Sequence, residues 1–345
     1  MLHRLCVAPM MDVTDRHCRY FLRQVSRRAF LYTEMITTGA LLHGDAERHL
    51  AFDQAEHPVG LQLGGSEPED LVRCARLAAE FGYDEINLNV GCPSERVQRG
   101  AFGACLMAEP QLVADCVRAM RDAVSIPVTV KHRTGIDRIE AYDFLAKFVA
   151  TVAAAGCKTF IVHARNAVLK GLSPRQNREI PPLKYPYVYR LKRDFPQLEI
   201  VVNGGIADPA AIESHLRRVD GVMIGRAAYG NPWLIADQGK SRAAVVRAMA
   251  RYARRVPALR QVTRHMLGLF HGHARARLWR RMLSDAARLS HNDPALLGEA
   301  LAAVESAPQE TPHERGMEAR QARLRCVLHT HTRAGVAVSA IPPRR

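Results

Sequence analysis

Side chains that can ionise or form hydrogen bonds recur directly after short apolar runs of this chain. Two glycine-containing segments, Asn203-Gly204-Gly205 and Gly225-Arg226, each follow such a run. Glycine lets backbone N–H groups approach an anion closely, and arginine adds a guanidinium that matches phosphate geometry. Two such turns in succession, each before a helix-like segment, predict a phosphate-binding site. The alternative is a pair of tight turns that bind nothing.

Two further residues of this kind indicate chemistry. Cys92 lies between a glycine and a proline after an apolar run, and a thiol with an ordinary pKa of roughly 8.5 is protonated at neutral pH and can act as a general acid. The alternatives are that Cys92 is a small buried hydrophobe, or that the nearby Cys105 is the acid. Lys131 follows another apolar run and is predicted to stabilise a developing anion, with a Schiff-base lysine as the alternative.

Eight apolar runs alternate with segments of helical periodicity, and such runs are typical of strands buried on both faces. This count predicts a TIM (β/α)8 barrel, in which the chemistry lies at the C-terminal ends of the strands. An open doubly wound sheet would place a glycine-rich turn after its first strand, and 10–14 contains no glycine. The runs are Leu5–Met10, Phe30–Met35, Val59–Gly64, Glu85–Val90, Val128–Arg133, Thr159–His163, Ile200–Gly204 and Gly221–Gly225.

The helical segments Glu69–Phe81 and Gln111–Ala123 have the clearest periodicity, and Ser66 is predicted to cap the first of them. After about Pro232 the strand pattern stops. We therefore expect a barrel domain over 1–235, a smaller all-helical domain over 240–305, and a disordered basic tail over 306–345. The helices expected in the second domain are Ala243–Arg255, Val262–Phe270, Ala274–Leu289 and Pro294–Val304.

The formal charge of +15 is unevenly distributed. Residues 1–240 carry 30 Lys and Arg against 27 Asp and Glu, whereas residues 241–345 carry 19 arginines, no lysine and seven acidic residues. This imbalance predicts a surface that binds RNA or DNA. A genome that favours arginine over lysine is the alternative, but it would not explain the imbalance. Arginines at helical spacing that we expect on one face are Arg277, Arg280, Arg281 and Arg288.

Several longer motifs accompany these residues. With them the chain resembles the tRNA-dihydrouridine synthases from about Leu5 to about Ser290, and within that family the DusA subfamily. The motifs are Pro9-Met10-Met11, Glu34-Met35, Gln62-Leu-Gly-Gly65, Asn87-Leu-Asn-Val-Gly-Cys-Pro93, Lys131-His-Arg-Thr-Gly135, His163-Ala-Arg165, Asn177-Arg-Glu-Ile-Pro-Pro182 and Arg264-His-Met-Leu-Gly-Leu-Phe270.

The resemblance implies an enzyme that reduces uridines 20 and 20a of the tRNA D-loop to dihydrouridine. It implies FMN as cofactor, NADPH as reductant, hydride transfer to uracil C6 and proton transfer from Cys92 to C5. Asn89 would offer the uracil a donor and an acceptor, and Arg178, Arg277, Arg280 and Arg281 would contact tRNA. The residues implied to hold FMN are Pro9, Met10, Met11, Gln62, Lys131, His163, Asn203, Gly204, Gly205, Gly225 and Arg226.

Composition excludes several other classes. There is no apolar run long enough to span a membrane, no signal peptide and no Cys/His spacing typical of a zinc site. Scattered single cysteines favour the cytoplasm. We expect no metal and no obligate protein partner. Two alternatives remain: a flavin-dependent barrel enzyme that acts on a free pyrimidine, and an RNA-binding chaperone that retains an inactive barrel.

Overall fold

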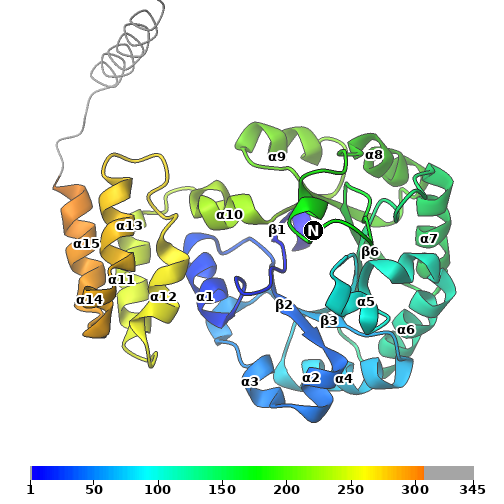
Figure 1. Cartoon of the computed structure of the whole chain (residues 1–345), viewed down its shortest axis with the longest axis horizontal. Helices are drawn as coiled ribbons and strands as arrows, with labels where there is room; N and C mark the ends of the chain where they lie inside the picture. Colours follow the sequence, from blue (N-terminus) through cyan, green and yellow to red (C-terminus); the bar gives the residue numbers. More distant parts are fainter. Residues whose placement is uncertain (1, 307–345) are drawn as a thin grey trace, which may run out of the picture.

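The computed structural model describes residues 2–306. The eight strands form one parallel sheet in the order β1-β8-β7-β6-β5-β4-β3-β2. The two edge strands, β1 and β2, close the sheet. The Val7 N–H donates to the Phe30 carbonyl, and the Phe30 N–H donates to the Leu5 carbonyl. The predicted TIM barrel is therefore confirmed (Figure 1). The strands are β1 (Leu5–Val7), β2 (Leu31–Thr37), β3 (Val59–Gly64), β4 (Glu85–Val90), β5 (Val128–Arg133), β6 (Thr159–His163), β7 (Glu199–Asn203) and β8 (Gly221–Ile224).

Strand β1 is shorter than the predicted run, which extended to Met10. Pro9 has no N–H to donate, so the ladder with β8 ends at the pair Val7 and Ile224, followed by one bond from the Ala8 N–H. Strand β2 instead continues to Thr37, pairing there with Gly64 of β3. The strands bury nearly every residue, as their continuous hydrophobicity predicted.

Helices follow the strands around the barrel, and local capping explains several of their starts. Asp15 and Asp208 accept hydrogen bonds at the first turns of α1 and α9. The predicted cap at Ser66 is wrong: α4 begins after Glu67 without a side-chain cap, and Pro68 supplies the pre-set first turn. These helices are α1 (Arg16–Val25), α2 (Thr38–His43), α3 (Ala46–Leu50), α4 (Pro68–Phe81), α5 (Glu95–Arg99), α6 (Pro110–Ala123), α7 (Tyr142–Ala154), α8 (Tyr185–Asp194), α9 (Pro209–Leu216) and α10 (Arg226–Gly230).

The end of the barrel opposite the C-terminal strand edge is closed by a buried ionic cluster. His3 contacts Glu85 at 2.6 Å and Glu199 at 2.8 Å. Burial alone would lower the pKa of His3, but the two carboxylates outweigh it and raise that pKa to about 10. The Tyr32 hydroxyl and the Thr129 hydroxyl also donate to Glu85, at 2.8 and 2.6 Å. The cluster therefore joins the beginnings of β4 and β7 to His3, which lies in the short helical turn before β1.

Within residues 2–306 the elements after β8 are all helices, and α11 and α12 pack against α1 beside the barrel (Figure 1). The predicted helix Ala274–Leu289 is two helices, because Asp285 interrupts it and caps the second by accepting from the N–H groups of Ala287 and Arg288. Trp279 is fully buried and donates to the Met266 carbonyl. The helices are α11 (Arg242–Ala253), α12 (Leu259–Met266), α13 (Ala276–Ser284), α14 (Ala286–Ser290) and α15 (Ala295–Glu305).

The helical region contacts the barrel through polar and aromatic pairs. His265 lies 3.0 Å from Asp15, and the Arg264 guanidinium donates to the Asp12 carbonyl in the loop after β1. The ring of Tyr252 stacks on Tyr20 at 3.9 Å between centroids. The predicted tail lies, apart from its first residue, outside the described residues. Within 2–306 we find no helix with both the length and the apolar character needed to cross a membrane.

Candidate active site

Strand register brings the predicted site residues to one edge of the barrel. Asn89 of β4 pairs with Lys131 of β5, and His163 of β6 lies between Arg133 of β5 and Asn203 of β7. Because the strands are parallel, their C-terminal ends meet at the barrel mouth. Sequence reasoning placed these residues together correctly.

A chain of side-chain hydrogen bonds joins β3 to β4 and reaches the Cys92 loop. The Asn89 Oδ1 accepts from the N–H groups of Gly91 and Cys92, at 3.1 and 2.9 Å. Its Nδ2 donates to the Gln62 Oε1 at 2.9 Å, and the Gln62 Nε2 donates to the Asn87 Oδ1 at 2.7 Å. Since backbone N–H groups can only donate, they fix which atom of each amide is oxygen.

This chain corrects the expected role of Asn89. Both lone pairs of its Oδ1 are occupied by the backbone of the Cys92 loop, so Asn89 has no acceptor left for a base. One N–H of its Nδ2 remains, so toward a ligand Asn89 can only donate. Gln62 still has one N–H and one lone pair, but it is almost fully buried.

The loop after β4 presents Cys92 at the mouth. Its carbonyl accepts from the Ala104 N–H at 2.9 Å, which ties it to the 3-10 helix Gly103–Ala108. Its thiol is half-buried and lies 3.6 Å from the Ser94 hydroxyl. The Cys105 thiol donates instead to the Phe102 carbonyl at 3.1 Å, and burial raises the pKa of Cys105. Of the two thiols, Cys92 is the one held by strand-end residues.

Lys131 and His163 lie at the mouth, and each has a nitrogen that makes no hydrogen bond within the described chain. Burial, together with Arg133, lowers the pKa of Lys131 to about 7, and no hydrogen bond joins its Nζ to the described part of the chain. His163 is also buried, and its Nδ1 has no partner there. Burial and the cations Arg133 and Lys131 lower the pKa of His163, so the imidazole is neutral at pH 7. Buried groups of this kind are favourable only when a ligand bonds to them.

The turn after β7 is tight and depends on two glycines. Gly204 and Gly205 have φ of +105° and +73°, conformations that L side chains rarely adopt. A Cβ on Gly204 would lie 3.1 Å from the His163 Nε2. The Tyr185 hydroxyl donates to the Gly204 carbonyl at 2.6 Å and holds the turn. The helix α9 that follows begins later, at Pro209, and its first turn is already capped by Asp208.

Arginines gather around the outer part of the mouth. Arg226, directly after Gly225, pairs with Glu179 at 2.5 Å. Burial and the charge of Arg226 lower the pKa of Arg178. The Arg165 Nε is buried without a partner in the described chain. Around Arg165, Arg178 and Arg226 the one carboxylate is that of Glu179, so this part of the mouth is positive and suits an anionic ligand.

The loop after β1 forms the remaining rim. The Met10 N–H and carbonyl both bond to Thr14, which fixes a turn, and Met11 is 57% exposed. The Met10 sulfur would lie 3.7 Å from a Cβ on Gly225, so the loops after β1 and β8 adjoin. The Asp12 N–H donates to Glu34, and burial raises the pKa of Glu34.

Sequence reasoning assigned no role to Arg133, which organises the mouth. Its guanidinium donates to the carbonyls of Gly91, Asn166 and Asn177, at 3.0, 3.3 and 3.0 Å. It thereby joins the loops after β4 and β6. Period-2 alternation along β5 was the available signal, since it places Arg133 on the same face as Lys131.

The predicted arginines of the helical region are separate from the mouth. Arg277, Arg280 and Arg281 are exposed on α13, whereas Arg288 lies on α14 beyond the break at Asp285. Arg288 pairs with Glu299 at 3.4 Å. The described residues contain no group of His, Cys, Asp and Glu arranged to hold a metal ion.

Comparisons with known proteins show the family of this chain. The family described as dihydrouridine synthase matches residues 6–307. A Synechocystis protein named tRNA-dihydrouridine(20/20a) synthase is 56% identical over 316 residues, covering 88% of this chain and 95% of that protein. The protein of that name from Escherichia coli K12 is 57% identical over 316 residues, covering 87% and 91%.

Similarity to solved structures shows the fold. A 2-naphthoyl-CoA reductase complex has a TM-score of 0.52 at 11% identity, covering 67% of this chain and 49% of that one. Histamine dehydrogenase from Rhizobium sp. 4-9 has a TM-score of 0.51 at 12% identity, covering 67% and 45%. The chain thus spans about half the length of these two structures. On the family match and the identity to its relatives, the chain belongs to the dihydrouridine synthase family.

Proposed function

We propose that this protein reduces uridines 20 and 20a in the D-loop of tRNA to 5,6-dihydrouridine, with FMN as cofactor and NADPH as reductant. The observation that carries the proposal is the 56–57% identity, over most of the chain, to proteins named for that reaction. The mouth described above supplies the chemistry. All seven cysteines in the described part are free thiols, which favours a cytoplasmic enzyme.

The residues at the mouth fit an anionic, aromatic cofactor. The His163 Nδ1 and the Arg165 Nε are buried without a partner in the described chain, and a bound flavin phosphate or ring can satisfy them. The partly buried Lys131 lies beside them on β5. Glycine is required at 204 and 205, because a Cβ there would meet the side chains of His163 and Leu183. When bound, FMN supplies the hydride for uracil C6. The residues proposed to hold it are Pro9, Met10, Met11, Gln62, Lys131, His163, Asn203, Gly204, Gly205, Gly225 and Arg226.

Cys92 gives the proton in this proposal. The free N–H of Asn89 orients the uracil by one of its carbonyls, and the thiol of Cys92 donates a proton to C5 as negative charge develops there. Lys131, with its pKa near 7, can hold positive charge close to that site when an anion is present. Arg133 keeps the loop that carries Cys92 in place through its bond to the Gly91 carbonyl.

Arginines outside the mouth bind the tRNA body. Every uracil presents the same edge, so the choice of uridine depends on how the tRNA is oriented. We assign that orientation to phosphate contacts from Arg178 beside the mouth and from Arg277, Arg280 and Arg281 on α13, all of them exposed. The target base must also leave its stack to enter the barrel.

Two measurements test the proposal. The purified protein is expected to be yellow and to release FMN on denaturation; a colourless protein that takes up no added FMN contradicts the flavin assignment. Sequencing of reduced sites in tRNA from a deletion strain is expected to show loss of dihydrouridine at positions 20 and 20a. Loss at positions 16 or 17 instead would leave the reaction intact and refute the choice of site.

A further inference from the structure

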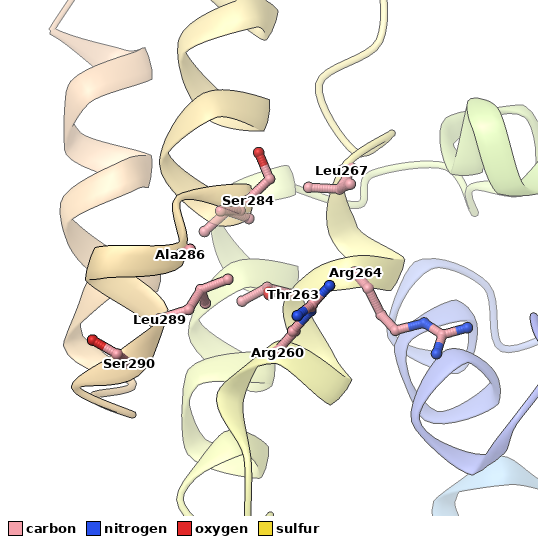
Figure 2. Close-up of a pocket in the computed structure, with 9 residues that line it drawn as sticks. Arg260, Thr263, Arg264, Leu267, Ser284, Ala286, Leu289 and Ser290 are labelled. Atoms are coloured by element: carbon pink, nitrogen blue, oxygen red, sulfur yellow. The ribbon is translucent and has the colours of Figure 1, made fainter.

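A cavity of about 410 Å³ lies in the helical region, between α12 and the pair α13 and α14 (Figure 2). Apolar side chains make up much of its wall, including Leu267, Leu283 and Leu289. None of the residues proposed to bind flavin or to react with uracil lines it, so the proposed function leaves it unexplained.

A buried hydroxyl in this cavity has no partner. Thr263 of α12 is fully buried, and its Oγ1 makes no hydrogen bond within the described chain. Figure 2 shows its side chain directed from α12 across the cavity toward Leu289. A buried hydroxyl left unsatisfied is unfavourable, although a threonine in a helix can often bond to a carbonyl of the preceding turn. A polar group of a ligand would supply the missing partner.

The charge around the cavity selects for an anion. Arg260 and Arg264 line it and are exposed, and no described residue that lines it is acidic. The region 242–306 carries twelve arginines and four acidic residues. Arg264 extends away from the cavity toward α1, where it bonds to the Asp12 carbonyl beside the barrel mouth (Figure 2). One arginine therefore joins the cavity to the rim of the candidate active site.

We propose that this cavity holds one unstacked nucleotide of the RNA substrate, near the uridine that enters the barrel. The base lies against the leucines, the hydroxyl of Thr263 bonds to its edge, and Arg260 binds the adjoining phosphate. A flat ring joined to a phosphate matches a wall that is apolar inside and cationic outside. The inference rests on the proposed function, because it takes RNA as the substrate, and adds a second base-binding site to it.

The first test fills the cavity. Ala286 and Ala287 are adjacent, exposed residues of α14, but only Ala286 lines the cavity. The dissociation constant of an unmodified tRNA transcript is measured for Ala286→Trp and for the matched control Ala287→Trp, together with FMN content and melting temperature. We expect Ala286→Trp to weaken binding about tenfold and Ala287→Trp less than about twofold, with FMN content unchanged in both.

A second pair of variants tests the proposal independently, in case Ala286→Trp does not fold. Thr263→Val keeps the shape and removes only the hydroxyl, and Arg260→Gln is compared with Arg251→Gln, an exposed arginine outside the cavity. Thr263→Val and Arg260→Gln should each weaken tRNA binding about three- to tenfold, and Arg251→Gln clearly less. Unchanged binding in both, with a wild-type protein that binds and reduces tRNA, overturns this inference alone. A wild-type protein without affinity for tRNA overturns the proposed function as well.

If Ala286→Trp lowers only the melting temperature and leaves tRNA affinity intact, the assignment of a nucleotide to this cavity is wrong.

Discussion

Replacement of Cys92 by alanine isolates the proton-transfer step. The Cys92 backbone is held by the Asn89 Oδ1 at its N–H and by the Ala104 N–H at its carbonyl, and alanine retains both bonds. The thiol itself contacts only the Ser94 hydroxyl, at 3.6 Å, within the described chain. We therefore expect Cys92→Ala to fold, to retain FMN and to bind tRNA normally.

The size of the defect follows from the exposure of the thiol. Removal of a general acid typically slows a reaction about 10²- to 10⁴-fold. Because Cys92 is half-buried rather than sealed, water can replace it as a poor proton donor. We expect a loss of about 10²- to 10³-fold in kcat, equivalent to about 3–4 kcal/mol of transition-state stabilisation, with KM for tRNA nearly unchanged.

The assay is dihydrouridine formation in a single turnover of pre-reduced enzyme mixed with excess tRNA, with flavin absorption recorded in parallel. Cys105→Ala is the matched control, since the Cys105 thiol is bonded to the Phe102 carbonyl, and it should retain activity within about twofold. A Cys92→Ala enzyme that reduces tRNA at a near wild-type rate, or a Cys105→Ala enzyme that is inactive, would refute the assignment.

Three further outcomes are expected. Reversing the charge at both Arg277 and Arg281 should weaken tRNA binding and flatten its dependence on salt by roughly one unit of logarithmic slope per phosphate contact, with FMN content unchanged; loss of flavin would mean that these arginines maintain the fold. Gly204→Ala should release FMN, because φ is +105° and the new Cβ would lie 3.1 Å from an imidazole nitrogen; a variant that retains a full complement of flavin contradicts this. The raised pKa of His3 stabilises the fold fully below its unfolded value of about 6.5, and that contribution is lost as pH rises through about 10. The melting temperature should therefore fall between pH 7 and pH 10 more steeply in the wild type than in His3→Ala, and parallel curves would show that the cluster does not titrate as described.

The barrel was predictable because each strand is buried on both faces and so leaves an uninterrupted apolar run. Most site residues were predictable for a related reason: a polar residue at the end of such a run, such as Lys131 or Asn203, cannot be explained by packing. The break in the predicted helix Ala274–Leu289 was less visible, since apolar spacing continues across it and only Asp285 indicates a new cap.

Features that depend on contacts distant in sequence could not be predicted. Asn89 has the amide that a base-binding residue needs, but only the fold shows that backbone N–H groups occupy both lone pairs of its oxygen. Likewise, nothing around His3 in the sequence indicates that Glu85 and Glu199 converge on it. Thr263 resembles an ordinary helical threonine until the cavity beside it is known.

The closure of the barrel has a consequence for the order of events during synthesis on the ribosome. Leu5 of β1 pairs with Val222 of β8, so one side of the first strand has no partner until about 220 further residues have been made. At typical translation rates this takes roughly 10–45 s. An unpaired strand edge is a site for association with other nascent chains. The shortness of β1, at three residues, limits that exposed edge, and completion of the barrel becomes a late, cooperative step of folding.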